Sequence, residues 1–433
     1  MNKKNENISY LKQCKVCGNG NLKRVLKINE QYISATFVKS NKNNELNKIK
    51  TPLTLSLCVQ NSEKKNCELL QLNEILNPEL LYRQYFYRSA ANDTMKISLH
   101  NVVESVLNIL KPKESDIIVD IGSNDCTLLN FYPNNLKLVG FEPAQNIEYI
   151  DKGKNIKVFS NYFNANDFNS NFKKKAKIIT SCAMFYDLIN PKDFVKDIFN
   201  ILEDDGIWCV QISYLLLMLK NVNFYDICHE HLSYYSIHSF EKLINQLNLK
   251  IFYAETNDVN GGSIRFYVCK NSCTKYESEK FFRKLDELKK EEAFYNLGDE
   301  DTYVKFQESI DELKNKTNSY IDSLLSKKET VLALGASTKG NILLQHFGIG
   351  KEKIPFISER NPTKVGLKCV GTDIELISES RARSLKPKAM IVLPWYFKNE
   401  IVKREQKYLD LGGQLMFPMP YPHVVTKESE IKL

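Results

Sequence analysis

Apolar residues recur along the chain at two spacings, which predict alternating helices and strands. Helical spacing predicts a helix over residues 80–110, in which Val102, Val103 and Val106 share one face and which Pro112 ends. Short uninterrupted apolar runs predict buried strands. These runs cover residues 117–121, 137–144, 177–183, 206–214, 249–256 and 263–269. The last two flank Asn260-Gly261-Gly262, a turn typical of hairpins, so we expect an α/β fold whose parallel sheet ends in an antiparallel hairpin.

The loop after the first of these strands has the composition of a nucleoside site. It contains Asp120, Gly122 and Asp125, and Glu142 follows at the end of the next strand, 20 residues after the glycine. In Rossmann-like folds an acid at that place accepts the hydroxyls of a ribose. A pyrophosphate would need more glycines at the helix start, so the single glycine and the added acid favour a nucleoside with a positive charge. S-adenosylmethionine fits this description, and a flavodoxin-like domain with another ligand is the alternative.

The strand order favours a class I methyltransferase, and missing motifs argue against nucleic acid as its methyl acceptor. Enzymes that methylate amino groups of DNA or RNA usually carry Pro-Pro and an aromatic residue after the fourth strand. This chain has SCAMFYDL there. It also lacks the Pro-Cys pair that supplies the nucleophile of a cytosine-C5 enzyme.

The densest catalytic chemistry is the run His229, Glu230, His231, which lies between the fifth strand and a helix that we expect to open near Ser239. Histidine suits proton removal near neutral pH because its usual pKa is about 6.5. Transfer of a methyl group to carbon needs such a base, whereas transfer to oxygen often needs little assistance. Two alternatives remain at this point, a pair of metal ligands and a purely structural turn.

Four of the eleven cysteines lie in the first 75 residues and predict a metal site. Cys14 and Cys17 form a C-x2-C pair followed by glycine, and Cys58 and Cys67 follow with a polar loop between them. Two such pairs supply the four thiolates of a tetrahedral structural zinc site. The alternatives are unrelated cysteines or a redox C-x2-C, which normally opens a helix after a strand.

The last third of the chain predicts two connecting helices and a second strand–loop–helix unit. Residues 275–328 are rich in Lys and Glu with apolar residues at helical spacing, and a strand at 330–334 leads into GASTKGN. Backbone amides of that loop, together with Ser337, Lys339 and Arg360, either grip a diphosphate or cap and brace the sheet. The closing LMFPMPYP is expected to be extended.

Composition and charge narrow the class of protein. The chain has 433 residues, 43% hydrophobic and 26% charged, which is ordinary for folded proteins, and its net charge is +8. Residues 1–75 hold thirteen Lys and Arg against six Asp and Glu, so the remaining residues are almost neutral and offer no long surface for nucleic acid. Eleven cysteines, an odd number, favour a reducing compartment. With no apolar membrane span and no secretory signal, we expect a cytoplasmic protein.

Ordered sequence blocks along nearly the whole chain resemble one known family, the C-methyltransferases that branch nucleotide-linked deoxysugars at a ring carbon. Besides the cysteine quartet, the resemblance rests on the following blocks: YFYRSAANDTM (85–95), DIGSND (120–125), GFEPA (140–144), ICHEHLSYYS (227–236), NGGSIR (260–265), GASTKGN (335–341), ISERNPTKVG (357–366), GTDIELIS (371–378) and VLPWYF (392–397).

The resemblance implies a zinc-binding module at 1–75, a class I methyltransferase core at 76–274, connecting helices at 275–328 and a Rossmann-like substrate domain at 329–433. It implies that a base removes the proton beside a 4-keto group, commonly at C3, and that the enolate takes the methyl group of S-adenosylmethionine. His231 is the favoured base, Glu230 orients or polarises it, and His229 is the runner-up. The cofactor residues would be Tyr87, Ser89, Asp120, Gly122, Ser123, Asn124, Asp125, Glu142 and Pro143, and the substrate residues Tyr85, Asn260, Gly261, Ser337, Lys339 and Arg360.

Three positions depart from the family pattern. Cys126 stands where a glycine is usual, Gln211 where a glutamate is common, and Cys228 where many members have tyrosine. The last change removes a hydroxyl near the sugar, so the departures affect substrate identity and rate more than the class of reaction.

Taken together, the sequence predicts a cytoplasmic zinc-containing C-methyltransferase that makes a branched sugar for a surface glycan or a glycosylated metabolite. The first alternative is an O- or N-methyltransferase on a sugar nucleotide. The second is a zinc-ribbon nucleic-acid binder with an inactive core. The expected partner is the sugar nucleotide, with no nucleic acid and no membrane, and the oligomeric state is left open, a monomer included.

Overall fold

A seven-stranded sheet forms the middle of the chain. The computed structural model describes residues 7–33, 37–39, 49–60, 66–83, 85, 87–91 and 93–433. The strands run in the spatial order β13-β14-β11-β10-β7-β8-β9, and all are parallel except β14. Their bounds are β7 (Ile117–Ile121), β8 (Lys137–Phe141), β9 (Lys157–Phe159), β10 (Ala176–Cys182), β11 (Leu202–Ser213), β13 (Leu249–Asn257) and β14 (Ser263–Lys270). The parallel sheet with its closing antiparallel hairpin confirms the prediction.

Both faces of this sheet are covered, which is why its strands read as continuous apolar runs. Alternate residues of β7 face opposite sides: Val119 lies in the apolar cluster that includes Val195, and Ile118 lies in the cluster that includes Val102. The helices around the sheet are α2 (Asp93–Ile109), α3 (Ala165–Asn171), α4 (Pro191–Ile201), α5 (Leu215–Lys220), α6 (Ile237–Asn245) and α7 (Glu279–Tyr295).

The continuous helix predicted for residues 80–110 is wrong. The chain forms a short helix α1 (Pro78–Tyr82), a 3-10 turn η2 (Ser89–Ala91) and only then α2. The reason is that the backbone amides of Ser89 and Ala90 donate to Asn124 Oδ1 at 3.0 Å and Asp125 Oδ2 at 2.8 Å. These amides serve the loop after β7 and are not available to a helix ladder.

The N-terminal residues form small sheets that connect to both larger ones. A four-stranded sheet has the order β12-β5-β4-β2, and its edge strand β12 (Ser233–Tyr234) comes from the middle of the chain. Strand β3 (Phe37–Val38) pairs instead with β17 of the C-terminal sheet. The other strands are β1 (Ile8–Tyr10), β2 (Leu22–Tyr32), β4 (Lys50–Cys58), β5 (Leu70–Leu72) and β6 (Glu74–Leu76).

The C-terminal part folds around a nine-stranded sheet of order β22-β21-β20-β19-β15-β16-β18-β17-β3. Its strands are β15 (Val331–Leu334), β16 (Phe356–Glu359), β17 (Lys368–Cys369), β18 (Glu375–Ser378), β19 (Ala389–Val392), β20 (Gln414–Phe417), β21 (His423–Val425) and β22 (Glu430–Lys432). Its helices are α9 (Thr338–Phe347), α10 (Glu379–Ser384), α11 (Lys398–Arg404) and α12 (Gln406–Asp410). Most of the closing LMFPMPYP lies outside a strand, since β20 ends at Phe417.

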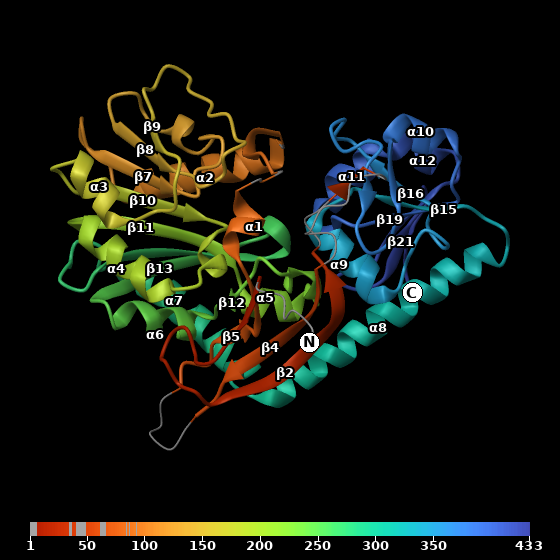
Figure 1. Ribbon diagram of the computed structural model, residues 1–433, viewed down its shortest axis with the longest axis horizontal. Helices are drawn as coiled ribbons and strands as arrows, with labels where there is room; N and C mark the ends of the chain where they lie inside the picture. The colour runs from red at the N-terminus through yellow and green to blue at the C-terminus, as the bar shows by residue number, and fades with distance from the viewer. Residues whose placement is uncertain are drawn as a thin grey trace.

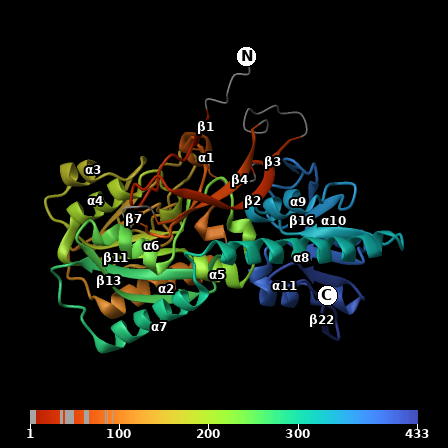
Figure 2. The same cartoon turned by 90° about the horizontal axis from the view of Figure 1, so that it is seen from below.

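The long helix α8 (Glu300–Leu325) runs from the middle of the chain to the C-terminal sheet. Figure 1 shows the two large sheets on opposite sides of the molecule, with β2 and β4 below the gap between them. The view in Figure 2 shows α8 passing across both halves. Among the described residues, none of the helices has the length and apolarity needed to cross a bilayer.

Candidate active site

The loop after β7 forms a compact hydrogen-bonded turn at the carboxyl end of the sheet. Gly122 has φ +72°, and a Cβ there would lie 3.1 Å from the side chain of Met184, so the position requires glycine. The amide of Asn124 donates to Glu142 Oε2 at 2.8 Å, and the amide of Ala144 donates to Oε1 at 2.8 Å. The predicted ribose acid is therefore fixed against the loop by two backbone amides.

The other predicted cofactor residues surround this turn. Asp120 lies below it, where the Thr180 hydroxyl donates to Oδ1 at 2.6 Å and burial raises the pKa of Asp120 to about 7. Asp125 Oδ1 accepts the Thr127 hydroxyl at 2.6 Å. Ser123 is buried under the loop, the carbonyl of Tyr87 accepts from the Asn124 amide group, and the carbonyl of Pro143 accepts from Arg83. The structure thus brings these residues together around one loop.

Cys126, the first departure from the family pattern, has φ +64°. Glycine adopts this left-handed conformation without the steric cost that a Cβ brings, which explains why glycine is usual there. The cysteine side chain is buried in the apolar cluster that contains Leu128 and Leu129. The loop keeps its shape, and the thiol fills part of the core beneath it.

The run His229, Glu230, His231 lies in a buried loop between the 3-10 turn η5 (Phe224–Asp226) and β12. The ring of His231 packs on Tyr186, with 4.3 Å between the ring centroids, and the amide of Leu232 donates to the Tyr186 carbonyl at 2.9 Å. Burial lowers the pKa of His231 to about 4. At neutral pH the imidazole is therefore uncharged and able to accept a proton.

Of the neighbours of His231, Cys228 and His229 are buried and Glu230 is partly buried. Burial lowers the pKa of His229 to about 4, although a hydrogen bond with the backbone of Thr51 opposes the shift. Burial raises the pKa of Glu230 to about 7, although the charge of Lys339 opposes the shift. Cys228, another departure, is buried and its carbonyl accepts from the His231 amide at 3.2 Å. Its backbone shapes the loop, and its thiol lies in the core.

Three residues near this loop were missed by the sequence analysis. Tyr82 donates its hydroxyl to the Glu230 carbonyl at 3.3 Å, and Tyr186 and Asp187 belong to the 3-10 turn η4 (Phe185–Asp187) that follows β10. Burial and the nearby Glu230 carboxylate raise the pKa of Asp187 well above its usual range. The available signal was position, because β10 neighbours β7 and its carboxyl end lies beside the cofactor loop.

Gln211, the third departure, supports a buried arginine. Arg265 is 2% exposed and donates to Gln211 Oε1 from Nε at 3.0 Å and Nη2 at 2.9 Å. Arg265 Nη1 also pairs with Glu255 at 2.9 Å. Because the amide of Gln211 is neutral, Glu255 supplies the counter-charge, and the hairpin β13–β14 is held to the end of β11.

The C-terminal sheet repeats the arrangement of the cofactor loop. Gly335 follows β15 with φ +84°, and the amide of Ala336 donates to Glu359 Oε2 at 3.1 Å, where Glu359 ends the neighbouring strand β16. The amide of Asn361, two residues further on, donates to Glu359 Oε1 at 2.7 Å. Glu142 holds the amides of Asn124 and Ala144 in the same way. The chain therefore contains two loops with the same arrangement of a glycine turn and a carboxylate that accepts two backbone amides.

The three residues predicted to grip a diphosphate do not converge. Ser337 caps α9 by accepting the Gly340 amide at 2.9 Å. Arg360 Nη1 lies 3.5 Å from Glu400, at the surface. Lys339 forms an ion pair with Asp226. Its contact with a diphosphate stays a prediction.

Asn260 and Gly261 lie where the two halves of the molecule meet. Lys339 Nζ donates to the Asn260 carbonyl at 3.2 Å, and a Cβ on Gly261 would lie 3.1 Å from the ring of Trp395. The carbonyl of Tyr85, the remaining predicted substrate residue, accepts from Asn146 at 3.1 Å. The hairpin turn therefore needs glycine because another segment packs closely against it.

The four N-terminal cysteines form one cluster. Their sulfurs lie within 4.8 Å of one another, with 3.3 Å between those of Cys14 and Cys67 and 3.5 Å between those of Cys17 and Cys58. Tetrahedral zinc with Zn–S bonds of about 2.3 Å places its sulfurs about 3.8 Å apart, so the cluster fits the metal. Hydrogen bonds from Cys14 and Cys67 lower the pKa of Cys58, whereas hydrogen bonds within the same cluster raise the pKa of Cys67. Residues 61–65 of the predicted loop lie outside the described residues.

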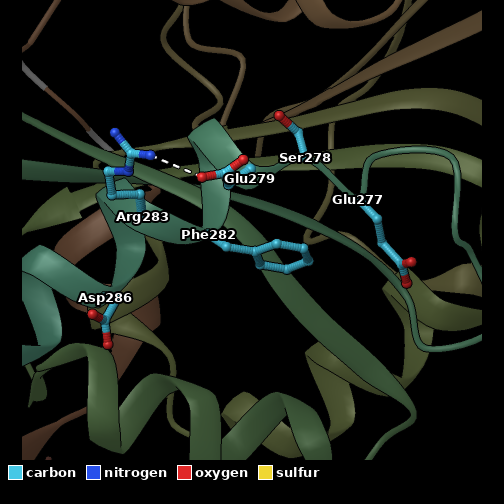
Figure 3. A pocket seen from close by; sticks show the side chains of 6 residues that line it. All are labelled: Glu277, Ser278, Glu279, Phe282, Arg283 and Asp286. Carbon is cyan, nitrogen blue, oxygen red and sulfur yellow. Dashed lines mark hydrogen bonds and ion pairs between the residues drawn. The ribbon is translucent and has the colours of Figure 1, made fainter.

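One surface hollow lies at the start of α7, away from the loops described above. Its lining is drawn in Figure 3 and includes Phe282 and the ion pair between Arg283 and Glu279 at 2.8 Å. An exposed pair of this kind supplies neither a base nor a nucleoside loop. The hollow therefore plays no part in the candidate active site.

Comparisons with known proteins agree with this geometry. Residues 14–82 match a family model described as "Putative zinc binding domain", residues 95–254 match a methyltransferase domain, and residues 258–420 match a C-methyltransferase C-terminal domain. The chain is 24% identical over 422 residues to the C-methyltransferase NovU of Streptomyces niveus, a match that covers 97% of this chain and 98% of that protein.

Solved structures resemble the chain more weakly. An S-adenosylmethionine-dependent methyltransferase from Clostridium acetobutylicum is 13% identical, with a TM-score of 0.30, covering 42% of this chain and 94% of that one. The plantazolicin methyltransferase BpumL in complex with SAH is 13% identical, with a TM-score of 0.32, covering 41% and 84%. With TM-scores this low, the fold assignment rests on the strand order and the family models.

The seven-stranded sheet and its matching domain define a class I methyltransferase that uses S-adenosylmethionine. The zinc-binding and C-terminal models flank that domain in one chain, and NovU matches over nearly the whole length. The chain is therefore an S-adenosylmethionine-dependent C-methyltransferase that is similar to NovU over nearly its whole length, and its two cofactors are S-adenosylmethionine and zinc.

Proposed function

We propose that this C-methyltransferase acts on a nucleotide-diphosphate-linked 4-keto sugar and methylates the ring carbon beside the ketone, commonly C3. The observation that carries the proposal is the environment of His231. Tyr186 links this buried, uncharged imidazole to the end of β10 beside the cofactor loop. Asp226, in the same loop as His231, links it to Lys339 at the start of α9. A base thus lies between two nucleoside-type loops, one for the cofactor and one for a nucleotide-linked substrate.

The chemistry divides into proton removal and methyl transfer. S-adenosylmethionine, when bound, supplies an electrophilic methyl group. His231 removes the proton from the carbon beside the ketone, and Glu230 orients or polarises the imidazole. His229 is the second candidate for the base, because its ring is buried in the same loop and its lowered pKa keeps it uncharged at neutral pH.

The cofactor would be held by the loop after β7 and by the segment that covers it. Glu142 would accept ribose hydroxyls with the lone pairs that its two amide contacts leave. Asp125 would lie near the positive charge of the ligand. The remaining contacts are assigned to Tyr87, Ser89, Asp120, Gly122, Ser123, Asn124 and Pro143.

The nucleotide half of the substrate would bind at the second loop. The pair of amide contacts on Glu359 supports a ribose site there, as at Glu142. Amides of residues 335–340, Ser337 and Arg360 would hold the diphosphate, and Tyr85, Asn260 and Gly261 would line the sugar. The four cysteines Cys14, Cys17, Cys58 and Cys67 would hold the zinc ion with no open ligand position.

None of the eleven cysteines, all of which are among the described residues, forms a disulfide, which supports a cytoplasmic enzyme. Its product would be a branched sugar for a surface glycan or a glycosylated metabolite.

Proton exchange tests the reaction directly. The enzyme is incubated with a nucleotide-linked 4-keto-6-deoxysugar in D₂O, with and without labelled S-adenosylmethionine. Without S-adenosylmethionine we expect deuterium at the carbon beside the ketone, and with it we expect the labelled methyl group on that same carbon in place of the hydrogen. His231→Ala should lose both, whereas His238→Ala, in α6, is the matched control. Label on oxygen or nitrogen without exchange would favour the O- or N-methyltransferase, and intact exchange in His231→Ala would contradict this base.

A further inference from the structure

Lys339 lies in the C-terminal half of the chain, but its ammonium group lies beside Asp226, close to the loop that carries His229, Glu230 and His231. It lies in the first turn of α9, and its Nζ forms an ion pair with Asp226, three residues before His229. Nζ also donates to the Asn260 carbonyl at 3.2 Å, and the rings of Tyr225 and Tyr396 each lie 5.9 Å away. Three separate segments therefore hold one ammonium group in place.

The burial of this pair is not explained by stability. Asp226 is 0% exposed, and the Lys339 side chain is 16% exposed. Removing two charges from water costs more than a well-packed apolar pair of similar size would. A buried ion pair between two halves of a molecule is therefore better explained by a charge that the site needs.

The lysine has a donor left for a ligand. An ammonium group carries three N–H donors, and within the described residues Asp226 and Asn260 accept two of them. The charge also reaches the catalytic groups, since Lys339 lowers the pKa of both Glu230 and His231. The remaining donor lies in the same electrostatic environment as the candidate base.

We propose that Lys339 is the cationic group that stabilises the carbonyl oxygen of the substrate during proton removal. When His231 takes the proton, the C–H electron pair forms a carbon–carbon double bond and the carbonyl π electrons move to the oxygen, which Lys339 Nζ contacts. When the carbon then forms its bond to the methyl group, the carbonyl is restored and the contact weakens. Asp226 positions the ammonium. This assignment rests on the proposed keto-sugar substrate.

The position of Lys339 gives a reason for the close packing of the two halves of the molecule. The cofactor loop follows β7 of the seven-stranded sheet, the base lies in the loop before β12, and the oxyanion group comes from α9 beside the second loop. A preorganised charge at the developing oxyanion contributes more than one brought there during the reaction. A substrate bound at the second loop would therefore meet its stabilising charge and its base together.

The test compares Lys339→Met with Lys339→Arg, using Lys353→Met as control. Lys353 also pairs with an aspartate, Asp322, at 2.7 Å, but links α8 to the loop before β16. We expect Lys339→Met to lower both kcat and the rate of deuterium exchange about 10²–10³-fold with little change in KM. Lys339→Arg should recover part of the loss, and Lys353→Met should match the wild type.

A pH profile separates contact with the oxyanion from an effect on the base. Removing the lysine raises the pKa of His231, so a purely electrostatic role would let the rate recover at higher pH. A group that contacts the oxygen leaves the loss at every pH. Recovery to the wild-type rate would overturn the proposal, as would a raised KM with unchanged kcat, which indicates a diphosphate contact instead.

Lys339→Met leaves Asp226 without its partner and can unfold the protein. The double variant Lys339→Met/Asp226→Asn restores neutrality and keeps the test decisive: a folded double variant that retains wild-type exchange overturns the proposal, and one that loses it supports it. Failure of the keto-sugar assignment looks different, because the wild-type enzyme itself would then exchange no proton on these substrates.

Discussion

The ring of His231 packs against the ring of Tyr186, with 4.3 Å between centroids and 53° between planes. Tyr186 lies in η4, the turn that follows β10, and His231 lies in the loop before β12, so the contact ties the candidate base to the segment at the carboxyl edge of the parallel sheet. The Leu232 amide and the Tyr186 carbonyl reinforce it at 2.9 Å. The base is thus fixed by the sheet that carries the cofactor loop.

Loss of this ring should affect catalysis more than substrate binding. We expect Tyr186→Ala to lower kcat about 10–100-fold, because a misplaced base loses much of its effect, with little change in KM. The cavity should also cost about 3 kcal/mol of stability. Tyr186→Phe keeps the ring and should retain most of the activity. Equal kcat in all three proteins would show that the stacking does not position the base.

The pH dependence of the rate should reflect the buried imidazole. His231 must be uncharged to accept a proton, and its pKa is lowered to about 4 by burial, whereas that of Glu230 is raised to about 7. Glu230→Gln removes the titration of the carboxyl beside the base, so protonation of His231 should then lower kcat/KM only as the pH approaches 4, and a change that remains near pH 7 belongs to Asp120. A midpoint near the usual histidine value of 6.5 would show that the base is solvated.

Burial of the histidines also links folding to pH. The folded pKa of His229 is about 4, below the usual 6.5, so the unfolded chain binds more protons between these values and stability is lost as the pH falls. The raised pKa values of Asp120 and Glu230 act oppositely, because their contributions are lost as the pH rises through 7. We expect the Tm measured by calorimetry to fall less on acidification for His229→Leu than for the wild type.

The sequence predicted local elements well and contacts between distant segments poorly. Strand β7 begins and ends where the apolar run does, because burial on both faces leaves a continuous signal. The helix predicted for 80–110 was wrong because the amides of Ser89 and Ala90 bond to side chains 35 residues away. Periodicity within a window carries no information about such partners.

The candidate site shows the same difference between local patterns, which the sequence predicted, and contacts between distant segments, which it did not. Some site residues could be named from the sequence because their chemistry requires them to be close together along the chain. These are the glycine loops, the cysteine pairs and His229-Glu230-His231. The ion pair between Lys339 and Asp226 and the packing of Tyr186 join residues that only the topology brings together. A lysine in a glycine-rich loop indicated phosphate, and its actual neighbour became visible only in the structure.

Removing zinc should weaken both stability and activity. Strand β12 follows the loop that carries His229, Glu230 and His231, and it pairs with β5 of the zinc-binding module. Disorder in that module would therefore also disturb the position of His231. We expect Cys17→Ser to lose the metal, to lower the Tm by about 5 °C or more and to reduce kcat. Cys273→Ala, a buried cysteine outside the cluster, should keep one zinc per chain by elemental analysis. Unchanged zinc in Cys17→Ser would contradict the four-thiolate site.

Cys126 offers a test of backbone strain in the cofactor loop. At φ +64° a β-branched residue is strongly disfavoured, so Cys126→Val should destabilise the protein by about 2 kcal/mol and weaken S-adenosylmethionine binding. Cys126→Gly removes strain but also a buried side chain, and these effects offset each other to within about 1 kcal/mol. Calorimetry should show a higher free energy of unfolding for the wild type and for Cys126→Gly than for Cys126→Val. Equal free energies of unfolding would contradict backbone strain at this position.

Glu142 and Glu359 allow the two nucleoside-type loops to be tested against each other. Each carboxylate accepts two backbone amides at the end of a second strand. A hydrogen bond to a charged group contributes about 1.5–3 kcal/mol, so each Glu→Gln change should weaken its own ligand about 10-fold or more. Titration calorimetry should show Glu142→Gln losing affinity for S-adenosylmethionine and Glu359→Gln losing affinity for a nucleoside diphosphate. Each variant is the control for the other. If Glu359→Gln instead left nucleotide binding intact, the second loop would serve only to brace β15 against β16, and the nucleotide would have to bind elsewhere.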